Sequence, residues 1–209
     1  MERKIIDFGV RFRQGRSWGL TSSLASTNCA TCVKSEEMHD LFKKRRSVRK
    51  YTSHPVSDRQ IKEILLAAMI APSANNLHPV EFLVIKDKKK LKKLSQCGLW
   101  QQFIKNAPVA IVVISNPVKS KNFWLIDASI AAAYIYLEAT NQGLATCWAN
   151  IYKGKTEDSQ DREAYVRKIL RIPVEKRVVC VMPVGYPDET AKEHDRADYD
   201  EKTVHWERW

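Results

Sequence analysis

The sequence predicts a layered domain of mixed strands and helices, of the α/β or α+β class. Two observations favour this class. Runs of β-branched and apolar residues, typical of buried strands, alternate with segments whose apolar residues recur at helical spacing. The 209 residues, 44% of them hydrophobic and 28% charged, suffice for one domain with a real core and hardly for two. No apolar run reaches the roughly 18 residues of a membrane helix, so we expect no membrane partner.

Regular patterning begins at Met38. Ser57 followed by Gln60 is a capping box, which predicts a helix that Pro72 stops. The residues at 122–141 are apolar almost all round, so we expect that helix to lie inside the protein. The remaining expected helices are 87–96 and 161–172, and the expected strands are 80–85, 108–115, 144–148 and 176–187.

Residues 1–37 differ from the rest of the chain, because they show no sustained period and their middle is rich in Ser and Thr. We expect a flexible extension, or an artefact of an upstream start codon with Met38 as the natural start. The five cysteines and the lack of a secretory signal favour free thiols in the cytoplasm. Cys29 and Cys32 form a lone C-x-x-C, without the second pair or the strand–helix context that a metal or redox site needs.

The formal net charge is +11, which favours acidic partners such as nucleic acid, an anionic surface or phosphorylated small molecules. Many lysines stand in one run at 86–94. We interpret this run as a solvated helix face, because neither a groove-reading motif nor interleaved aromatic residues accompany it. A second basic cluster, KKRRSVRKY at 43–51, has the arginines and the serine that a single phosphate would need.

Motifs for common chemistries are missing. The sequence has no H-E-x-x-H, no G-x-S-x-G and no Gly-rich phosphate loop, and its five histidines lack metal-ligand spacing. A cofactor could supply the reactivity instead, and side chains would have to hold its phosphate. RRSVRKY (45–51) offers planar arginine forks that suit phosphate oxygens. APSANNLHP (71–79) offers amides that donate and accept together, as a heterocycle requires.

These stretches, taken in order, resemble the nitroreductase family of FMN enzymes. RRSVRKY, a helix, APSANNLHP and a strand resemble the opening of that family. Residues 126–148 (IDASIAAAYIYLEATNQGLATCW) resemble its central helix and the strand after it, and the ending from PVGYP at 183–187 resembles its last strand and tail. The likeness covers 38–209, which we expect to be an FMN-binding domain. It implies an α+β fold, a three-layer α/β/α domain with a mixed central sheet, in an intertwined homodimer whose two subunits both form the FMN cleft.

The resemblance also implies roles for individual residues. Arg45, Arg46 and Ser47 would hold the FMN phosphate and ribityl chain, with Arg196 closing the phosphate site. Arg49 would lie near the N1/O2 edge of the flavin, where a cation stabilises the negative charge of the reduced ring.

Two further segments would contact the flavin ring. Asn76 would hydrogen-bond its pyrimidine edge, with Ser73 as a weaker candidate from the same loop. Trp148 would pass beside the ring, with Asn150 and the backbone of Ile151 near N5 and O4.

Three departures from the family pattern stand out. His78 occupies a position where the family often has Gln. Residues 149–152 (ANIY) replace a Gly-rich turn, and His194 stands where some relatives have Lys. These departures leave open whether His78 and His194 contact FMN.

The resemblance implies an FMN-dependent oxidoreductase that passes electrons from NADH or NADPH, in ping-pong fashion, to a small organic acceptor such as a nitroaromatic, a quinone or a flavin. The flavin would carry the chemistry, so no catalytic side chain and no metal is expected, and we expect no nucleic-acid partner. One alternative is a reductive dehalogenase or flavin-modifying enzyme of the same fold. Alternatives of another class are a basic nucleic-acid-binding protein without activity, and a protein that stores or senses FMN.

Overall fold

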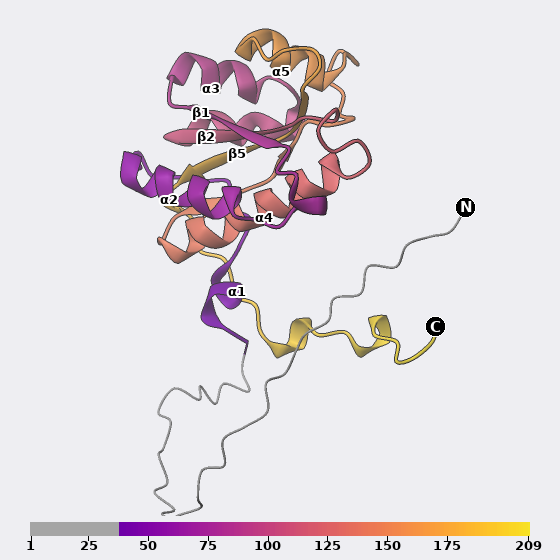
Figure 1. Cartoon of the computed structure of the whole chain (residues 1–209). Coiled ribbons are helices and arrows are strands. Elements are labelled where there is room, and N and C mark those ends of the chain that lie inside the picture. Colours follow the sequence, from indigo (N-terminus) through magenta and orange to yellow (C-terminus); the bar gives the residue numbers. More distant parts are fainter. Residues whose placement is uncertain (1–37) are drawn as a thin grey trace, which may run out of the picture. The chain divides into compact units, whose positions relative to one another are not determined.

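Five strands form one sheet in the computed structural model, which describes residues 38–209 (Figure 1). The strand β2 (Val109–Ser115) lies between β1 (Val80–Ile85) and β5 (Arg177–Gly185). The short strands β3 (Ala145–Thr146) and β4 (Ala149–Asn150) pair along the other side of β5. The expectations for residues 1–37, including Cys29 and Cys32, lie outside the described residues.

The pairing between the strands of this sheet is antiparallel throughout. A mixed sheet was expected, but the parallel pairing in the described chain is one isolated bridge, between Ser47 and Thr146. Further along this segment, Tyr51 bridges to Pro187 in the antiparallel sense. The α+β class is confirmed, with helices accompanying an antiparallel sheet.

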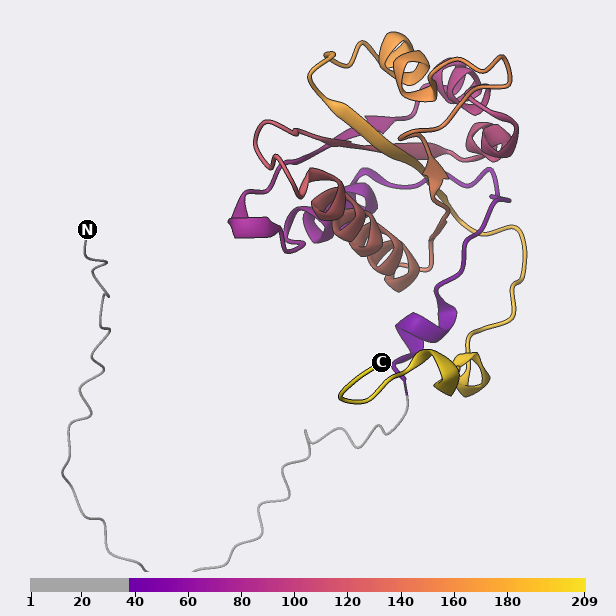
Figure 2. The same cartoon turned by 90° about the vertical axis from the view of Figure 1, so that its right-hand side faces the viewer.

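Helices cover both faces of the sheet, as Figures 1 and 2 show. On one face, α2 (Asp58–Met69) and α4 (Trp124–Asn141) share a core with Ile111 and Val113 of β2. On the other face, α3 (Lys88–Ser95), the 3-10 segment η2 (Leu99–Asn106) and α5 (Arg162–Leu170) pack on Val112. The alternation of Ile111, Val112 and Val113 follows the two-residue period of a strand, and β2 is buried along its whole length.

The helix ends follow the local signals. Ser57 Oγ accepts from Gln60 N at 3.2 Å and Gln60 Oε1 accepts from Ser57 N at 3.1 Å, which confirms the capping box. The helix α4 ends before Gly143, whose φ of 70° is the left-handed conformation that glycine tolerates. This helix is less enclosed than expected, because Ile126 is 55% exposed.

The glycine of the G-Y-P sequence marks a close approach between three segments. A Cβ at Gly185 would lie 2.8 Å from Pro108 Cδ and 3.1 Å from Tyr51 Cβ. Tyr51 is buried, and its hydroxyl donates to Val48 O at 2.6 Å. The basic segment 45–51 is therefore packed tightly against the end of β5.

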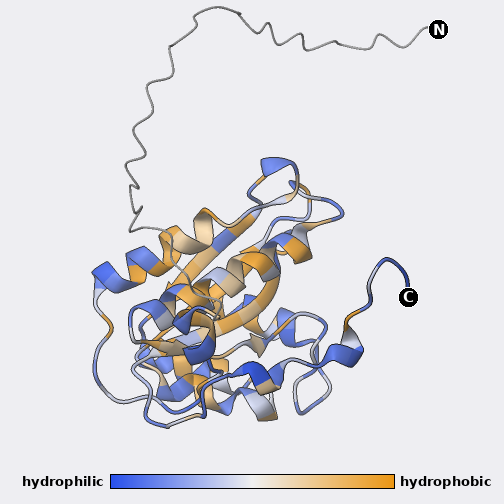
Figure 3. Cartoon of the chain, turned by 90° about the horizontal axis from the view of Figure 1, so that it is seen from below, coloured by the Kyte–Doolittle hydropathy of each residue, from blue (hydrophilic) through white to orange (hydrophobic). Residues whose placement is uncertain are grey.

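The chain beyond β5 returns to its first described helix, α1 (Asp40–Lys44), and the two lie side by side in Figures 1 and 2. His194 N donates to Lys43 O at 2.9 Å. Two 3-10 turns follow, η3 (Arg196–Asp198) and η4 (Glu201–Thr203). Figure 3 shows the hydrophobic residues gathered in the strands and the helices stacked on them, whereas the tail is mostly hydrophilic. In residues 38–209, no helix is long and apolar enough to cross a membrane.

Candidate functional site

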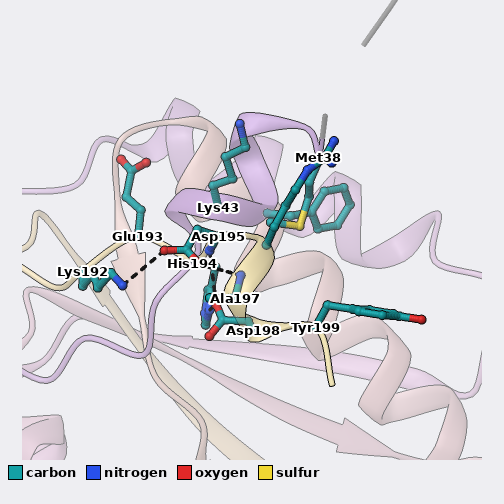
Figure 4. A pocket seen from close by; sticks show the side chains of 11 residues that line it. Met38, Lys43, Lys192, Glu193, His194, Asp195, Ala197, Asp198 and Tyr199 are labelled. Carbon is teal, nitrogen blue, oxygen red and sulfur yellow. Dashed lines mark hydrogen bonds and ion pairs between the residues drawn. The ribbon is translucent and has the colours of Figure 1, made fainter. Parts of the chain in front are cut away.

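Two distant parts of the chain meet at the imidazole ring of His194. Arg45 Nη2 lies 3.1 Å and Arg46 Nη1 lies 3.2 Å from His194 Nε2. Arg196 follows two residues later, and it lines a cavity of about 1010 Å³ together with Lys43 and His194 (Figure 4). The fold thus brings Arg45 and Arg46 to His194, two residues before the tail arginine.

Hydrogen bonding assigns the tautomer of His194. Both guanidinium groups can only donate, so Nε2 accepts. Nδ1 then carries the proton and donates to Asp198 Oδ2 at 2.7 Å. This hydrogen bond lowers the pKa of Asp198. The imidazole therefore lies between two guanidinium donors and the Asp198 carboxylate.

Arg45 and Arg46 form no direct ion pair with an acid among residues 38–209, and the Asp198 carboxylate lies beyond the imidazole that they contact. Within the described part of the chain, neither guanidinium lies within ion-pair distance of a carboxylate. Each side chain is half-buried, which reduces the screening of its charge by water. Two guanidinium groups held together in this way suit a dianion such as a phosphate monoester.

Ser47 is fixed between the sheet edge and the central helix. Its neighbour Val48 donates its backbone N–H to Thr146 O at 3.1 Å, and Ser47 Oγ lies 3.2 Å from Tyr136 Oη. The Arg45 guanidinium stands 5.5 Å from the centre of the Tyr136 ring. Sequence reasoning missed Tyr136, because it occupies an ordinary position in an apolar helix and only its hydroxyl is unusual there.

Arg49 lies one step further along the same edge. Val48 is buried whereas Ser47 and Arg49 are exposed, as alternation along an extended segment requires. The backbone N–H of Arg49 donates to Glu189 Oε1 at 2.7 Å, and its guanidinium lies 5.7 Å from the Phe103 ring. Burial raises the pKa of the adjacent Cys147 thiol, against the opposing effect of the Arg49 charge.

The loop 71–79 is closed by its own side chains. Ser73 Oγ accepts from His78 N at 2.9 Å, and Asn76 Oδ1 lies 2.6 Å from His78 Nε2. Positive φ angles occur at Asn75, Asn76 and His78. Asn tolerates this left-handed conformation, which explains its use here.

This loop does not meet the basic motif within one chain. The loop is attached near the start of α4, where Ala74 N donates to Asp127 Oδ1 at 2.8 Å. Ser47 contacts Tyr136, nine residues further along the same helix. At about 1.5 Å per residue, these two anchor points are about 13 Å apart. Ser73 and Asn76 are thus separated from Arg45–Ser47 in the single chain.

The segment at 148–151 is joined to the basic motif through Tyr136, whose Oη accepts from Trp148 N at 2.6 Å. Trp148 Nε1 donates to Asn150 Oδ1 at 3.3 Å, and Asn150 is exposed. The backbone N–H of Ile151 donates to Val179 O at 3.0 Å, and its side chain is fully buried. The backbone donor that the sequence resemblance implied at Ile151 is therefore already used within the fold.

Arg162 fixes the segment at 148–151 through hydrogen bonds to backbone carbonyls. Its guanidinium donates to Asn150 O and to Cys97 O, both at 2.9 Å, and also to Lys155 O. Gly154 leaves the space, because a Cβ there would lie 2.8 Å from Arg162 Nη1. A helix-periodicity argument treats Arg162 as a surface residue of α5, so the sequence analysis did not identify it. Among residues 38–209, no cluster of side chains could hold a metal ion.

Comparisons with known proteins show which family the chain belongs to. The model of the family described as the Nitroreductase family matches residues 42–97 and 95–186. A relative from Archaeoglobus fulgidus, whose name pairs NADH dehydrogenase with NAD(P)H nitroreductase, is 35% identical over 83% of this chain and 99% of its own. FMN reductase of Bacillus subtilis is 26% identical over 70% of this chain and 65% of its own.

A solved structure gives the same picture. The FMN-dependent nitroreductase of Clostridium difficile R20291 has 41% sequence identity to this chain and a TM-score of 0.78. The match covers 81% of this chain and 98% of that protein. The family model alone spans more than half of the 209 residues. This chain is an oxidoreductase that belongs to the nitroreductase family.

Proposed function

We propose that this protein binds FMN and uses it to pass electrons from NADH or NADPH to a small organic acceptor, a nitroaromatic, a quinone or another flavin. The observation that carries the proposal is the pair of guanidinium groups, Arg45 and Arg46, held on His194 with no carboxylate of residues 38–209 within ion-pair distance of either. When bound, FMN would supply the two-electron chemistry, accepting a hydride from the nicotinamide and releasing electrons to the acceptor.

The chain's own residues would bind the FMN phosphate and orient the flavin ring. Arg45, Arg46 and Arg196 would donate to the phosphate oxygens, and Ser47 would add a short donor. Arg49, exposed beside Ser47, would approach the N1/O2 edge of the ring and stabilise negative charge there.

The flavin ring would lie against the segment at 148–151, which is joined to Tyr136 by a hydrogen bond. Trp148 and the exposed Asn150 would pass beside it, since both belong to the segment that Arg162 holds in place. Both substrates would visit one cleft in turn, which gives ping-pong kinetics and parallel lines in double-reciprocal plots. None of these residues has to donate or accept a proton in the reaction.

We also propose that the site is completed in an intertwined homodimer. The two points on α4 that hold the loop with Ser73 and Asn76 and the basic motif are about 13 Å apart in one chain, by helix rise, and this separation supports a second copy supplying the loop. Unpartnered apolar side chains on α1, on α4 and in the tail support this arrangement: Phe42, Ile126 and Trp206 are 49%, 55% and 79% exposed. Within each subunit, residues 38–209 would form the FMN-binding domain, and helices on both faces of the sheet support the three-layer arrangement.

The test is the visible spectrum of the purified protein, reconstituted with FMN and recorded under argon before and after NADH or NADPH. The proposal expects a flavin band that either nicotinamide bleaches and that a quinone restores. A flavin band that neither nicotinamide bleaches would indicate FMN storage instead. A colourless protein that binds DNA with strong salt dependence would indicate the nucleic-acid alternative. Light scattering at the same concentration should give twice the mass of the chain, and a monomeric holoenzyme would contradict the homodimer.

A further inference from the structure

We propose that Tyr136 is a positioning residue of the FMN site, which directs the Ser47 hydroxyl proton toward the phosphate and fixes the start of the segment at 148–151. The inference rests on the proposed function and adds a residue that the sequence motifs do not contain. Tyr136 lies in the middle of α4 (Trp124–Asn141), between the buried Ile135 and Ala139. Its backbone is therefore held by the core.

The phenol oxygen joins the two segments that are expected to hold FMN. It accepts a hydrogen bond from Trp148 N at 2.6 Å, and it lies 3.2 Å from Ser47 Oγ. These two partners, Ser47 and Trp148, belong to different segments of the fold and are 101 residues apart in the sequence. One oxygen atom on a buried helix thus sets the distance between the phosphate motif and the ring segment.

Either hydroxyl could donate in the contact between Tyr136 and Ser47, and a phosphate beside Ser47 would select the direction. Burial raises the pKa of the Tyr136 phenol, so it keeps its proton. Since the phenol oxygen accepts from Trp148 N, its own proton is available to Ser47 Oγ. Ser47 then keeps its hydroxyl proton for another acceptor. The reverse direction would leave only serine lone pairs facing a phosphate, which an anion disfavours.

The face of the Tyr136 ring also contacts an arginine of the phosphate motif. The Arg45 guanidinium stands 5.5 Å from the Tyr136 ring centre, a cation–π contact that limits where this side chain can point. The thiol of Cys147 lies in the same cluster, and burial raises its pKa, so it adds no negative charge that would oppose a phosphate. Tyr136 thus orients a hydroxyl donor, a cation and a backbone segment without having to touch the flavin.

The test compares FMN and riboflavin binding to five forms of the full chain by quenching of flavin fluorescence. Tyr136→Phe removes only the phenol oxygen. Tyr134→Phe is the matched control, because Tyr134 is on the same helix, partly exposed and without a hydrogen bond to any described residue. We expect Tyr136→Phe to raise the FMN Kd about tenfold and the riboflavin Kd by no more than about threefold, because riboflavin lacks the phosphate but would still meet the segment at 148–151. Tyr134→Phe should match the wild type for both ligands.

A double variant tests whether Tyr136 acts through Ser47. Ser47→Ala should weaken FMN binding by itself, and adding Tyr136→Phe should weaken it further by less than about threefold, because the hydroxyl that Tyr136 directs is already gone. Full additivity, an FMN Kd of Tyr136→Phe within about twofold of the wild type, or an equal loss for FMN and riboflavin would overturn the inference. If the wild type itself does not bind FMN, the proposed function fails and the inference falls with it.

Discussion

The first prediction concerns Glu163, a buried carboxylate between α5 and β5. It is 2% exposed and accepts four hydrogen bonds. Arg177 donates from Nε at 2.9 Å and from Nη2 at 2.8 Å, Val178 donates its backbone N–H at 2.9 Å, and Arg167 donates from Nη1 at 3.0 Å. Both carboxylate oxygens are thus used, and α5 is fastened to the start of β5.

The same cluster extends to the predicted ring segment. The guanidinium carbon of Arg177 lies 5.3 Å from the Trp124 ring centre and 5.0 Å from that of Tyr152. Tyr152 directly follows Ile151 in the chain. Glu163 therefore helps to position α4 and the 148–152 segment through Arg177.

Glu163→Gln keeps the shape of the side chain but replaces one acceptor oxygen with a donor amide. Whichever way the amide turns, an N–H faces an arginine donor, and both arginines lose their counter-charge. Breaking a buried ion pair costs about 3–5 kcal/mol. The side chains of Arg177 and Arg167 are 34% and 19% exposed and can regain water. We therefore expect the lower end of that range, about 3 kcal/mol of the free energy of unfolding.

Urea unfolding of the two proteins at equal protein and flavin concentrations measures this loss. With a denaturant slope of about 2 kcal/mol per M, the midpoint should fall by about 1.5 M. Glu157→Gln is the control, because Glu157 is exposed and should leave the midpoint unchanged. If Glu163→Gln behaves like Glu157→Gln, the buried cluster does not stabilise the fold as we argue.

Three further predictions concern packing, the ring segment and pH. Gly185→Ala should lower the free energy of unfolding by about 1–3 kcal/mol, because its methyl meets Pro108 and Tyr51; urea unfolding matching the wild type would contradict this. Arg162→Gln should speed amide hydrogen exchange at 150–155 but not along β2, and unchanged exchange there would show that Arg162 does not hold the segment. Burial raises the pKa of the Cys97 thiol to about 11, so the unfolded chain ionises first. Stability should therefore fall as the pH rises from about 8.5 toward 11, and less steeply in Cys97→Ala; equal slopes would contradict this.

Local signals predicted most of the fold. The capping box at Ser57 and the apolar run of β2 depend on neighbouring residues, so the sequence pattern predicts them directly. The expected strand at 144–148 was only partly right. The pairing is interrupted at Cys147 and Trp148, where Trp148 N donates to Tyr136 on α4, and it resumes at β4 in the same register along β5. A contact with a side chain twelve residues earlier cannot be recognised from a local sequence pattern.

The site was less accessible to pattern analysis. The contact of Arg45 and Arg46 with His194 joins residues nearly 150 positions apart, so no periodicity predicts it, and the family resemblance implied only that the basic motif and Arg196 hold one phosphate. Tyr136 and Arg162 went unnoticed, because helical spacing classifies them only as helix residues. The use of the Ile151 N–H by Val179 also depends on strand pairing, which the sequence alone does not specify.

The central claim is that the basic motif and the tail arginine together hold a phosphate, and the preference for FMN over riboflavin tests it most directly. The wild type should bind FMN at least about a hundredfold more tightly than riboflavin. Arg45→Ala and Arg196→Ala should each reduce this preference at least about tenfold while riboflavin binding and the fold persist, and the exposed control Lys50→Ala should keep it. Equal affinities of the wild type for both flavins, or full preference in both arginine variants, would contradict the account.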